Sequence, residues 1–134
     1  MFGRTRRQPS ARQGTTDAPA AAVPSVVVTV DDDNFFDETA GGLSIVDFWA
    51  AWCGPCRTFA PVFEAAAVDY NGHVRFGKCS VDDNPMTTGL LQIQSIPTLV
   101  TFEPGGSELE RVSGAISRAH LDTIIKRLSP TTSR

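Results

Sequence analysis

The feature that most restricts the fold of this chain is the segment at residues 43–50, "LSIVDFWA", which is apolar at nearly every position. A strand with one face in water alternates apolar and polar residues, whereas a nearly continuous apolar run of this length is typical of a strand covered on both faces. Strands of that kind belong to parallel sheets with a layer of helices on each side. The segment therefore predicts an α/β fold with this strand inside a three-layer sandwich.

Four further segments are short and rich in β-branched or aromatic residues, as strands usually are. They are residues 26–30, 74–81, 98–102 and 109–113. The last two flank the turn residues Pro104-Gly105-Gly106, which indicates an antiparallel hairpin. We therefore expect five strands, the last two of which are neighbours.

Helices are predicted to begin at four places, which are residues 31–34, Cys53, Asn84 and Ser117. Asp, Asn and Ser are frequent N-cap residues, and apolar side chains at helical spacing follow. Pro61 lies inside the second helix and should kink it, and the third helix should end near Ile93. The predicted order of elements is β-α-β-α-β-α-β-β-α, in which parallel crossovers precede a terminal hairpin and helix.

Length and composition fit one soluble domain. The chain has 134 residues, of which 41% are hydrophobic and 20% are charged, and this is enough for a hydrophobic core. Its apolar runs are shorter than the roughly 18 residues that a membrane span needs, so we expect no membrane partner. After position 25 the chain has 8 basic and 14 acidic residues. This acidic balance argues against nucleic acid as a partner.

Residues 1–25 differ from the rest, because they are rich in Arg, Ser, Thr, Ala and Pro and show no periodicity. Such a segment buries too little apolar surface to offset the entropy of ordering, and we interpret it as a disordered tail. The alternatives are an export signal that begins at Arg6-Arg7, which lacks the apolar run such signals need, and an organelle transit peptide. We expect a domain at 26–128, a short flexible C-terminal tail at 129–134 and a cytoplasmic location.

The three cysteines are too few for a disulfide-stapled secreted domain, and their odd number argues against full structural pairing. Two of them, Cys53 and Cys56, stand at the end of a strand and the start of a helix in "WCGPC". Unpaired N–H groups and the helix dipole stabilise a thiolate there, so the pKa of Cys53 should fall. Cys56, one turn further along, should be less exposed and able to attack a mixed disulfide formed at Cys53.

Gly54 and Pro55 separate these two cysteines. Gly54 permits the close approach of another chain, and Pro55 at a helix start fixes φ and donates no hydrogen bond. The alternative for the pair is half of a zinc site, but the sequence has no second Cys pair, and His73 and His120 lack ligand spacing. We therefore predict redox chemistry and no metal.

A carboxylate, Asp47, stands in the middle of the apolar strand. Burial should raise its pKa, and from a position below Cys56 it could exchange a proton with that thiol, directly or through one water. Lys78 on the next strand is a candidate partner that limits the cost of the buried charge. Two alternatives stay open: Asp47 simply accepts hydrogen bonds from nearby backbone groups, and Lys78 simply extends to solvent.

Two further features concern single residues. Ile96-Pro97 stands between a loop and a strand, where proline cannot donate to the sheet, and a cis peptide bond is possible there. Cys79 lies on an inner strand, and we interpret it as a small buried hydrophobe; the alternative is a regulatory thiol.

Together these residues resemble the thioredoxin family. The resemblance covers about residues 25–128 and rests on five features, which are "VDFWAAWCGPC" at 46–56, Pro61, Lys78 before "VDDNP", "SIPT" at 95–98, and Gly114 before the last helix. It implies the thioredoxin fold, in which four helices flank a five-stranded mixed sheet. It also implies that Pro97 is cis and faces the dithiol.

The same resemblance implies roles for single residues. Cys53 would be the attacking thiol, Cys56 the resolving thiol, and Asp47 the buried acid and base with Lys78 as its neighbour. The residues that would bind or border the substrate are Trp52, Gly54, Pro55, Ile96, Pro97 and Gly114. In the family, the backbone beside the cis proline pairs with the substrate as an added strand, which requires little of the substrate's sequence.

The function that the resemblance implies is general reduction of disulfides in client proteins. Such an enzyme binds no cofactor besides its own Cys53–Cys56 disulfide, and a flavoprotein, thioredoxin reductase, restores its thiols with NADPH. We expect a monomer. Gly-Pro between the cysteines resembles the reducing members of the family, because isomerases and oxidants usually carry a histidine there. Two hypotheses compete: a scaffold or processivity subunit with incidental redox activity, and an oxidant.

Overall fold

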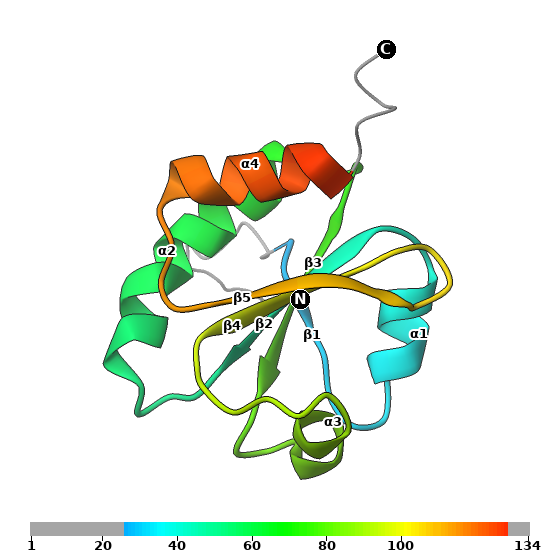
Figure 1. Cartoon of the computed structure of the whole chain (residues 1–134), viewed down its shortest axis with the longest axis vertical. Coiled ribbons are helices and arrows are strands. Elements are labelled where there is room, and N and C mark those ends of the chain that lie inside the picture. The colour runs from blue at the N-terminus through cyan, green and yellow to red at the C-terminus, as the bar shows by residue number, and fades with distance from the viewer. Residues whose placement is uncertain (1–25, 129–134) are drawn as a thin grey trace, which may run out of the picture.

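A computed structural model of the chain describes residues 26–128 (Figure 1). The predicted tails, 1–25 and 129–134, lie outside the described residues. The five strands are β1 (Val28–Thr29), β2 (Ser44–Trp49), β3 (Arg75–Ser80), β4 (Thr98–Phe102) and β5 (Glu108–Ser113). The four helices are α1 (Phe35–Ala40), α2 (Gly54–Asp69), α3 (Pro85–Leu90) and α4 (Arg118–Leu128). Within 26–128, no helix combines the length and the apolar character that crossing a membrane requires.

The strands form one mixed sheet in the order β1-β3-β2-β4-β5. β1, β3 and β2 run parallel, whereas β4 is antiparallel to β2, and β5 is antiparallel to β4. The predicted order of elements, α/β sandwich and terminal hairpin are therefore confirmed. The central strand β2 is buried from Ser44 to Phe48, as its apolar run predicted. Because β2 and β3 are parallel, their carboxyl ends meet at the same edge of the sheet, where the turn into α2 begins.

Helices cover both faces of the sheet, α2 and α4 on one face and α1 and α3 on the other (Figure 1). Successive residues of β2 alternate between two apolar clusters: Ile45 packs with α2 and α4, whereas Val46 and Phe48 pack with Phe35 of α1. Side chains two residues apart on a strand share a face. Asp47 therefore faces α2 and α4, on the same side as Ile45.

The short helix α3 begins as predicted, with Asn84 at the N-cap position and Pro85 as its first residue, but its end and its capping hydrogen bonds differ from the prediction. This helix ends at Leu90, before Ile93, and the side chain of Asn84 makes no capping hydrogen bond. Instead, Asp32 from the loop between β1 and α1 accepts hydrogen bonds from the backbone N–H of Thr87 at 2.8 Å and from its hydroxyl at 2.7 Å. Local spacing therefore predicted the N-cap position, but the acceptor of these hydrogen bonds comes from a distant part of the chain.

The predictions for α2 and α4 match the structure more closely. Ser117 caps α4, where its hydroxyl oxygen accepts a hydrogen bond from the N–H of His120 at 3.1 Å. Pro61 lies inside α2, as predicted. The apolar stripes of both helices face the sheet, and the buried members are Phe59, Phe63, Ala66, Leu121, Ile124 and Ile125.

Candidate functional site

The cysteine pair lies where β2 turns into α2. Cys53 is the N-cap residue of α2 and has an extended backbone, with φ −88° and ψ 113°. Its sulfur is joined to that of Cys56 in a disulfide, and the two Cα atoms are 5.3 Å apart. The helix brings the second sulfur back beneath the first because residues three apart lie on the same side of a helix. The geometry thus shows that these two cysteines pair with each other in a disulfide.

The start of α2 supplies a positive field to the sulfur of Cys53. The backbone N–H of Cys56 points at this sulfur, with a nitrogen–sulfur distance of 3.2 Å. This contact, together with the dipole of a 16-residue helix, favours negative charge on Cys53 when the pair is reduced. Cys53 is 5% exposed and Cys56 is 3% exposed, so in the disulfide form the two differ little in exposure. The backbone N–H that points at the sulfur of Cys53 distinguishes the two cysteines more clearly than their exposure does.

Asp47 lies on the side of β2 that faces α2, and it is fully buried, with 0% of its surface exposed. Within the described residues neither carboxylate oxygen has a hydrogen-bond partner. This contradicts the alternative in which Asp47 accepts hydrogen bonds from nearby backbone groups. Burial raises the pKa of Asp47 to about 7, and the positive charge of Lys78 limits that rise.

Lys78 is the register partner of Asp47 on the neighbouring strand β3. Its ammonium nitrogen lies over the ring of Trp49, 4.5 Å from the ring centroid. Lys78 is half-buried, so it does not simply extend to solvent. Trp49 was not among the predicted site residues. Its position two residues after Asp47 on the same strand was the available signal, because such residues share a face of the sheet.

The loop before β4 lies against the disulfide. The Ile96-Pro97 peptide bond is cis, and Ile96 packs against the small cluster of Ala50, Cys53 and Cys56. The carbonyl oxygen of Ile96 is 3.9 Å from the sulfur of Cys53. A strand-like peptide that pairs with this loop would therefore run directly past the reactive sulfur.

Gly114 contacts this loop, and Trp52 directly precedes the cysteine pair. The N–H of Gly114 donates to the carbonyl of Pro97 at 2.7 Å, and Gly114 has φ 98°, which glycine adopts without strain. Trp52 is 68% exposed, and its indole N–H donates to Asp82 at 2.8 Å. The prediction missed Asp82. It follows β3 at the same edge of the sheet as the cysteine pair, and this placement was the available signal.

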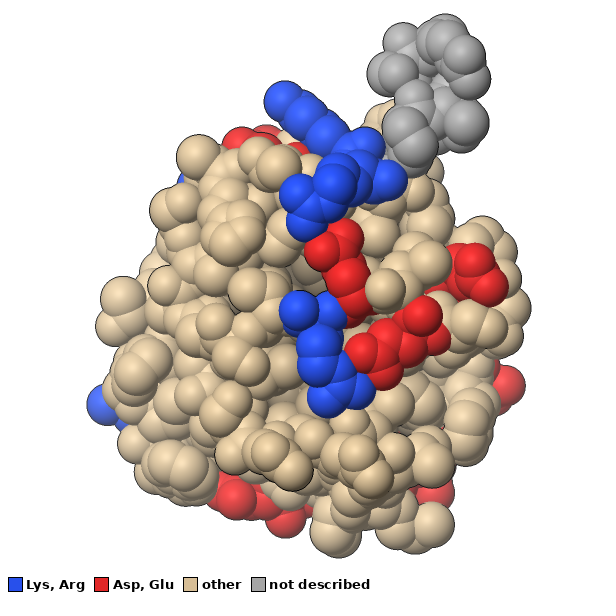
Figure 2. Space-filling model, viewed as in Figure 1, with Lys and Arg blue, Asp and Glu red and all other residues tan. Residues whose placement is uncertain are grey.

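Charge is unevenly spread on the face shown in Figure 2. Lys, Arg, Asp and Glu gather over β5 and the end of α4, whereas the surface between β5 and the start of α2 is mostly uncharged. Two ion pairs lie in the charged region: Arg127 with Glu110 at 2.9 Å, and Arg111 with Glu108 at 2.7 Å. The surface next to the cysteine pair therefore suits an uncharged stretch of polypeptide.

Cys79 lies on the other face of the sheet from Asp47. It is 0% exposed, is not part of a disulfide, and packs with Val46 and Phe48. Burial raises the pKa of its thiol to about 12, and the charges of Asp32 and Asp31 add to that rise. A thiol of this kind is unreactive at neutral pH, which agrees with its interpretation as a small buried hydrophobe.

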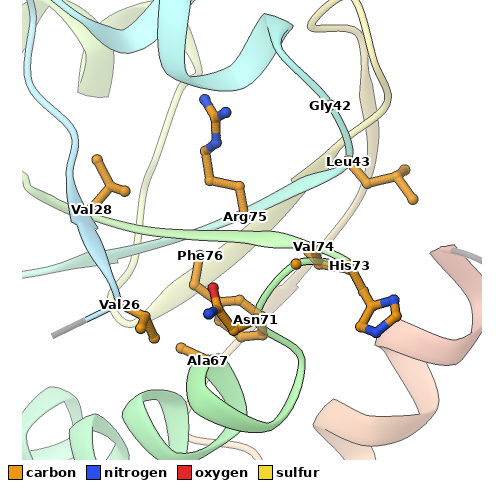
Figure 3. Close-up of a pocket in the computed structure, with 11 residues that line it drawn as sticks. Val26, Val28, Gly42, Leu43, Ala67, Asn71, His73, Val74, Arg75 and Phe76 are labelled. Carbon is orange, nitrogen blue, oxygen red and sulfur yellow. The ribbon is translucent and has the colours of Figure 1, made fainter.

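A cavity of about 330 Å³ lies at the opposite end of the sheet from the cysteine pair. Figure 3 shows the residues that line it, which come from around the starts of β1, β2 and β3 and from the end of α2 and the loop after it. The guanidinium of Arg75 is paired with Glu38 at 3.2 Å. The cavity contains none of the predicted site residues. Its lining residues are Val26, Val28, Gly42, Leu43, Ala67, Asn71, Gly72, His73, Val74, Arg75 and Phe76.

Comparison with known proteins gives a consistent result. The family model described as Thioredoxin matches residues 26–127. A thioredoxin from Staphylococcus saprophyticus is 42% identical over 101 residues, which is 75% of this chain and 96% of that protein. Thioredoxins from Staphylococcus haemolyticus and Staphylococcus aureus are 40% and 39% identical with the same coverage. The matched region includes the cysteine pair, the buried carboxylate and the cis proline.

Proposed function

Because the chain belongs to the thioredoxin family, we propose that its Cys53 attacks client disulfides and that its Cys56 resolves the mixed disulfide. The protein is a thiol-disulfide oxidoreductase that reduces protein disulfides. The observation that carries the division of roles is the backbone N–H of Cys56, which points at the sulfur of Cys53 at 3.2 Å.

The reaction transfers two electrons from the dithiol to the client. The thiolate of Cys53 attacks one sulfur of the client disulfide, a bond forms between them, and the other client sulfur leaves and takes up a proton. The thiolate of Cys56 then attacks the sulfur of Cys53, which releases the second client thiolate. The client ends as a dithiol, and the protein ends with the Cys53–Cys56 disulfide.

The second step needs a proton acceptor for Cys56, and we assign that role to Asp47. Its pKa of about 7 leaves a substantial fraction of the carboxyl ionised at neutral pH and makes its conjugate acid a ready donor. Asp47 lies two residues after Ile45 on β2, so both side chains face α2. Ile45 belongs to the same apolar cluster as Phe59, which lies one helical turn after Cys56. Lys78 limits the cost of the ionised carboxyl.

On this proposal, clients bind along the mostly uncharged surface between β5 and the start of α2, next to the disulfide. The backbone of Ile96 pairs with an extended segment of the client, as strands added to a sheet do. Trp52 contributes an exposed apolar ring on one side, and Gly114 leaves room on the other. Gly54 and Pro55 complete the surface at the start of α2, and Pro97 holds the loop. Because backbone groups supply most contacts, the range of clients should be broad.

The remaining assignments follow from family membership. Clients are proteins that contain disulfides, and the dithiol is restored by thioredoxin reductase with NADPH. The protein works as a cytoplasmic monomer, and it uses no bound cofactor besides its own disulfide. The catalytic domain is residues 26–128.

Reduction of insulin in the presence of dithiothreitol tests this function. Wild type should accelerate the reaction, Cys53→Ser should not, and Cys79→Ala is the matched control, because it removes a thiol outside the pair and should behave like wild type. Equal rates for Cys53→Ser and wild type would favour the hypothesis of a scaffold or processivity subunit with incidental redox activity. Equilibration in graded glutathione buffers gives the direction of electron flow. An oxidant would remain reduced in buffers that oxidise a reductase.

A further inference from the structure

Three side chains from two neighbouring strands meet on the face of the sheet that α2 covers. Asp47 and Trp49 are two residues apart on β2, so both point to this face. Lys78 lies opposite Asp47 in the parallel register of β2 and β3. The ammonium of Lys78 can therefore reach either of two partners: the carboxylate of Asp47 or the ring of Trp49.

In the structure the ammonium lies with the ring. The Lys78 nitrogen is 4.5 Å from the centroid of Trp49, which is within the range of a cation–π contact. The described residues contain no ion pair within 4.0 Å between Lys78 and Asp47, and neither oxygen of Asp47 has a hydrogen-bond partner there. The nearest cation thus acts on the carboxyl group from a distance.

We propose that Trp49 is a positioning residue for Asp47: its ring holds the Lys78 ammonium away from the carboxyl group, so that Asp47 keeps no close counter-ion. This inference rests on the proposed function only where it concerns turnover, since a carboxyl group bonded to an ammonium would be a weaker base toward Cys56. The ring favours this arrangement because a half-buried ammonium over an aromatic face retains part of its hydration, whereas a buried ion pair requires both groups to lose water.

The other described groups packed around Asp47 are uncharged, so Lys78 is the charged neighbour that affects its pKa. The register partner of Asp47 on β4 is Leu99, and α4 presents Leu121 and Ile125 to this face. α2 presents the dithiol, which carries no charge in the disulfide form. Within the described residues, Lys78 is the charged group that shifts the ionisation of Asp47.

The test is an NMR titration of the Asp47 side-chain carbon in the oxidised protein. Trp49→Leu should lower the pKa of Asp47 by about 0.5 pH unit, because the freed ammonium moves to the carboxylate. Trp49→Phe retains a weaker ring and should give a smaller decrease. Trp52→Leu is the matched control, since it removes a neighbouring indole that does not contact Lys78, and it should leave the titration unchanged.

The same titration in a Lys78→Met background separates this mechanism from simple entry of water. There, Trp49→Leu should have no effect on the pKa of Asp47. An equal decrease with and without the lysine would overturn the proposal, and so would an unchanged pKa in Trp49→Leu. If Trp49→Leu does not fold, Trp49→Phe, with and without Lys78, decides the question in the same way.

A second measurement keeps the positioning role apart from the catalytic one. The pH profile of insulin reduction should shift to lower pH in Trp49→Phe by the same amount as the titration. If the titration shifts and the pH profile does not, the acid–base role of Asp47 is wrong, and the positioning role of Trp49 stands. If the titration does not shift, the positioning role is wrong whatever the profile shows.

Discussion

Replacement of the buried carboxylate should make the protein more stable, and the gain should depend on pH. Asp47 has an ordinary pKa of 3.8, which the fold raises to about 7. The folded protein therefore holds this proton more tightly than the unfolded chain does. Stability that is fully present below about pH 4 is lost as the pH rises to about 7, because the unfolded carboxyl ionises first.

The size of the effect follows from the two pKa values. A difference of about 3 pH units corresponds to about 4 kcal/mol in the free energy of unfolding. Between pH 5 and pH 8 the loss is about 2.5 kcal/mol. Asp47→Ala removes the titrating group and so avoids this loss. From pH 5 to pH 8, the free energy of unfolding of the variant relative to wild type should therefore rise by about 2.5 kcal/mol. The cost of the small cavity is the same at both and cancels.

Guanidinium chloride unfolding of the oxidised proteins at pH 5 and pH 8 measures this difference. The oxidised form is used because its two redox cysteines do not titrate. Val46→Ala, which shortens a buried apolar side chain at the neighbouring position of β2, is the matched control and should destabilise equally at both pH values. If Asp47→Ala and wild type show the same pH dependence, the reasoning on the buried carboxyl is refuted.

Three further predictions concern other residues of the site and the core. In reduced Cys56→Ser, the pH dependence of alkylation should give Cys53 a pKa below the ordinary thiol value of about 8.5, because the start of α2 stabilises its thiolate. An ordinary pKa would contradict that role for the helix. Asp82→Ala removes the acceptor of the Trp52 N–H and should raise KM for insulin by about 2- to 5-fold with little change in kcat; a change confined to kcat would contradict a binding role. Cys79→Ala should lower the free energy of unfolding by about 1–2 kcal/mol and leave insulin reduction unchanged, whereas slowed reduction would support the regulatory alternative.

The order of helices and strands was predictable because it depends on short-range patterns. The apolar run of β2 required cover on both faces, and Pro104-Gly105-Gly106 required a turn between the last two strands. The N-cap position of Asn84 before Pro85 was predictable in the same way, but the capping hydrogen bonds of α3 were not. Asp32 accepts them because the loop between β1 and α1 packs beside the start of this helix.

The chemistry of the site also depends partly on short-range sequence patterns and partly on contacts between distant segments. Cys53 and Cys56 lie within one turn of helix, so their spacing alone predicts a dithiol, and the apolar neighbours of Asp47 alone predict its burial. The choice of Lys78 between a carboxylate and the ring of Trp49 depends on strand register and on the rotamer of a long side chain. Spacing along a chain governs backbone conformation over a few residues, whereas contacts between strands arise only when distant segments pack together, and these contacts set the proton affinity of the buried acid.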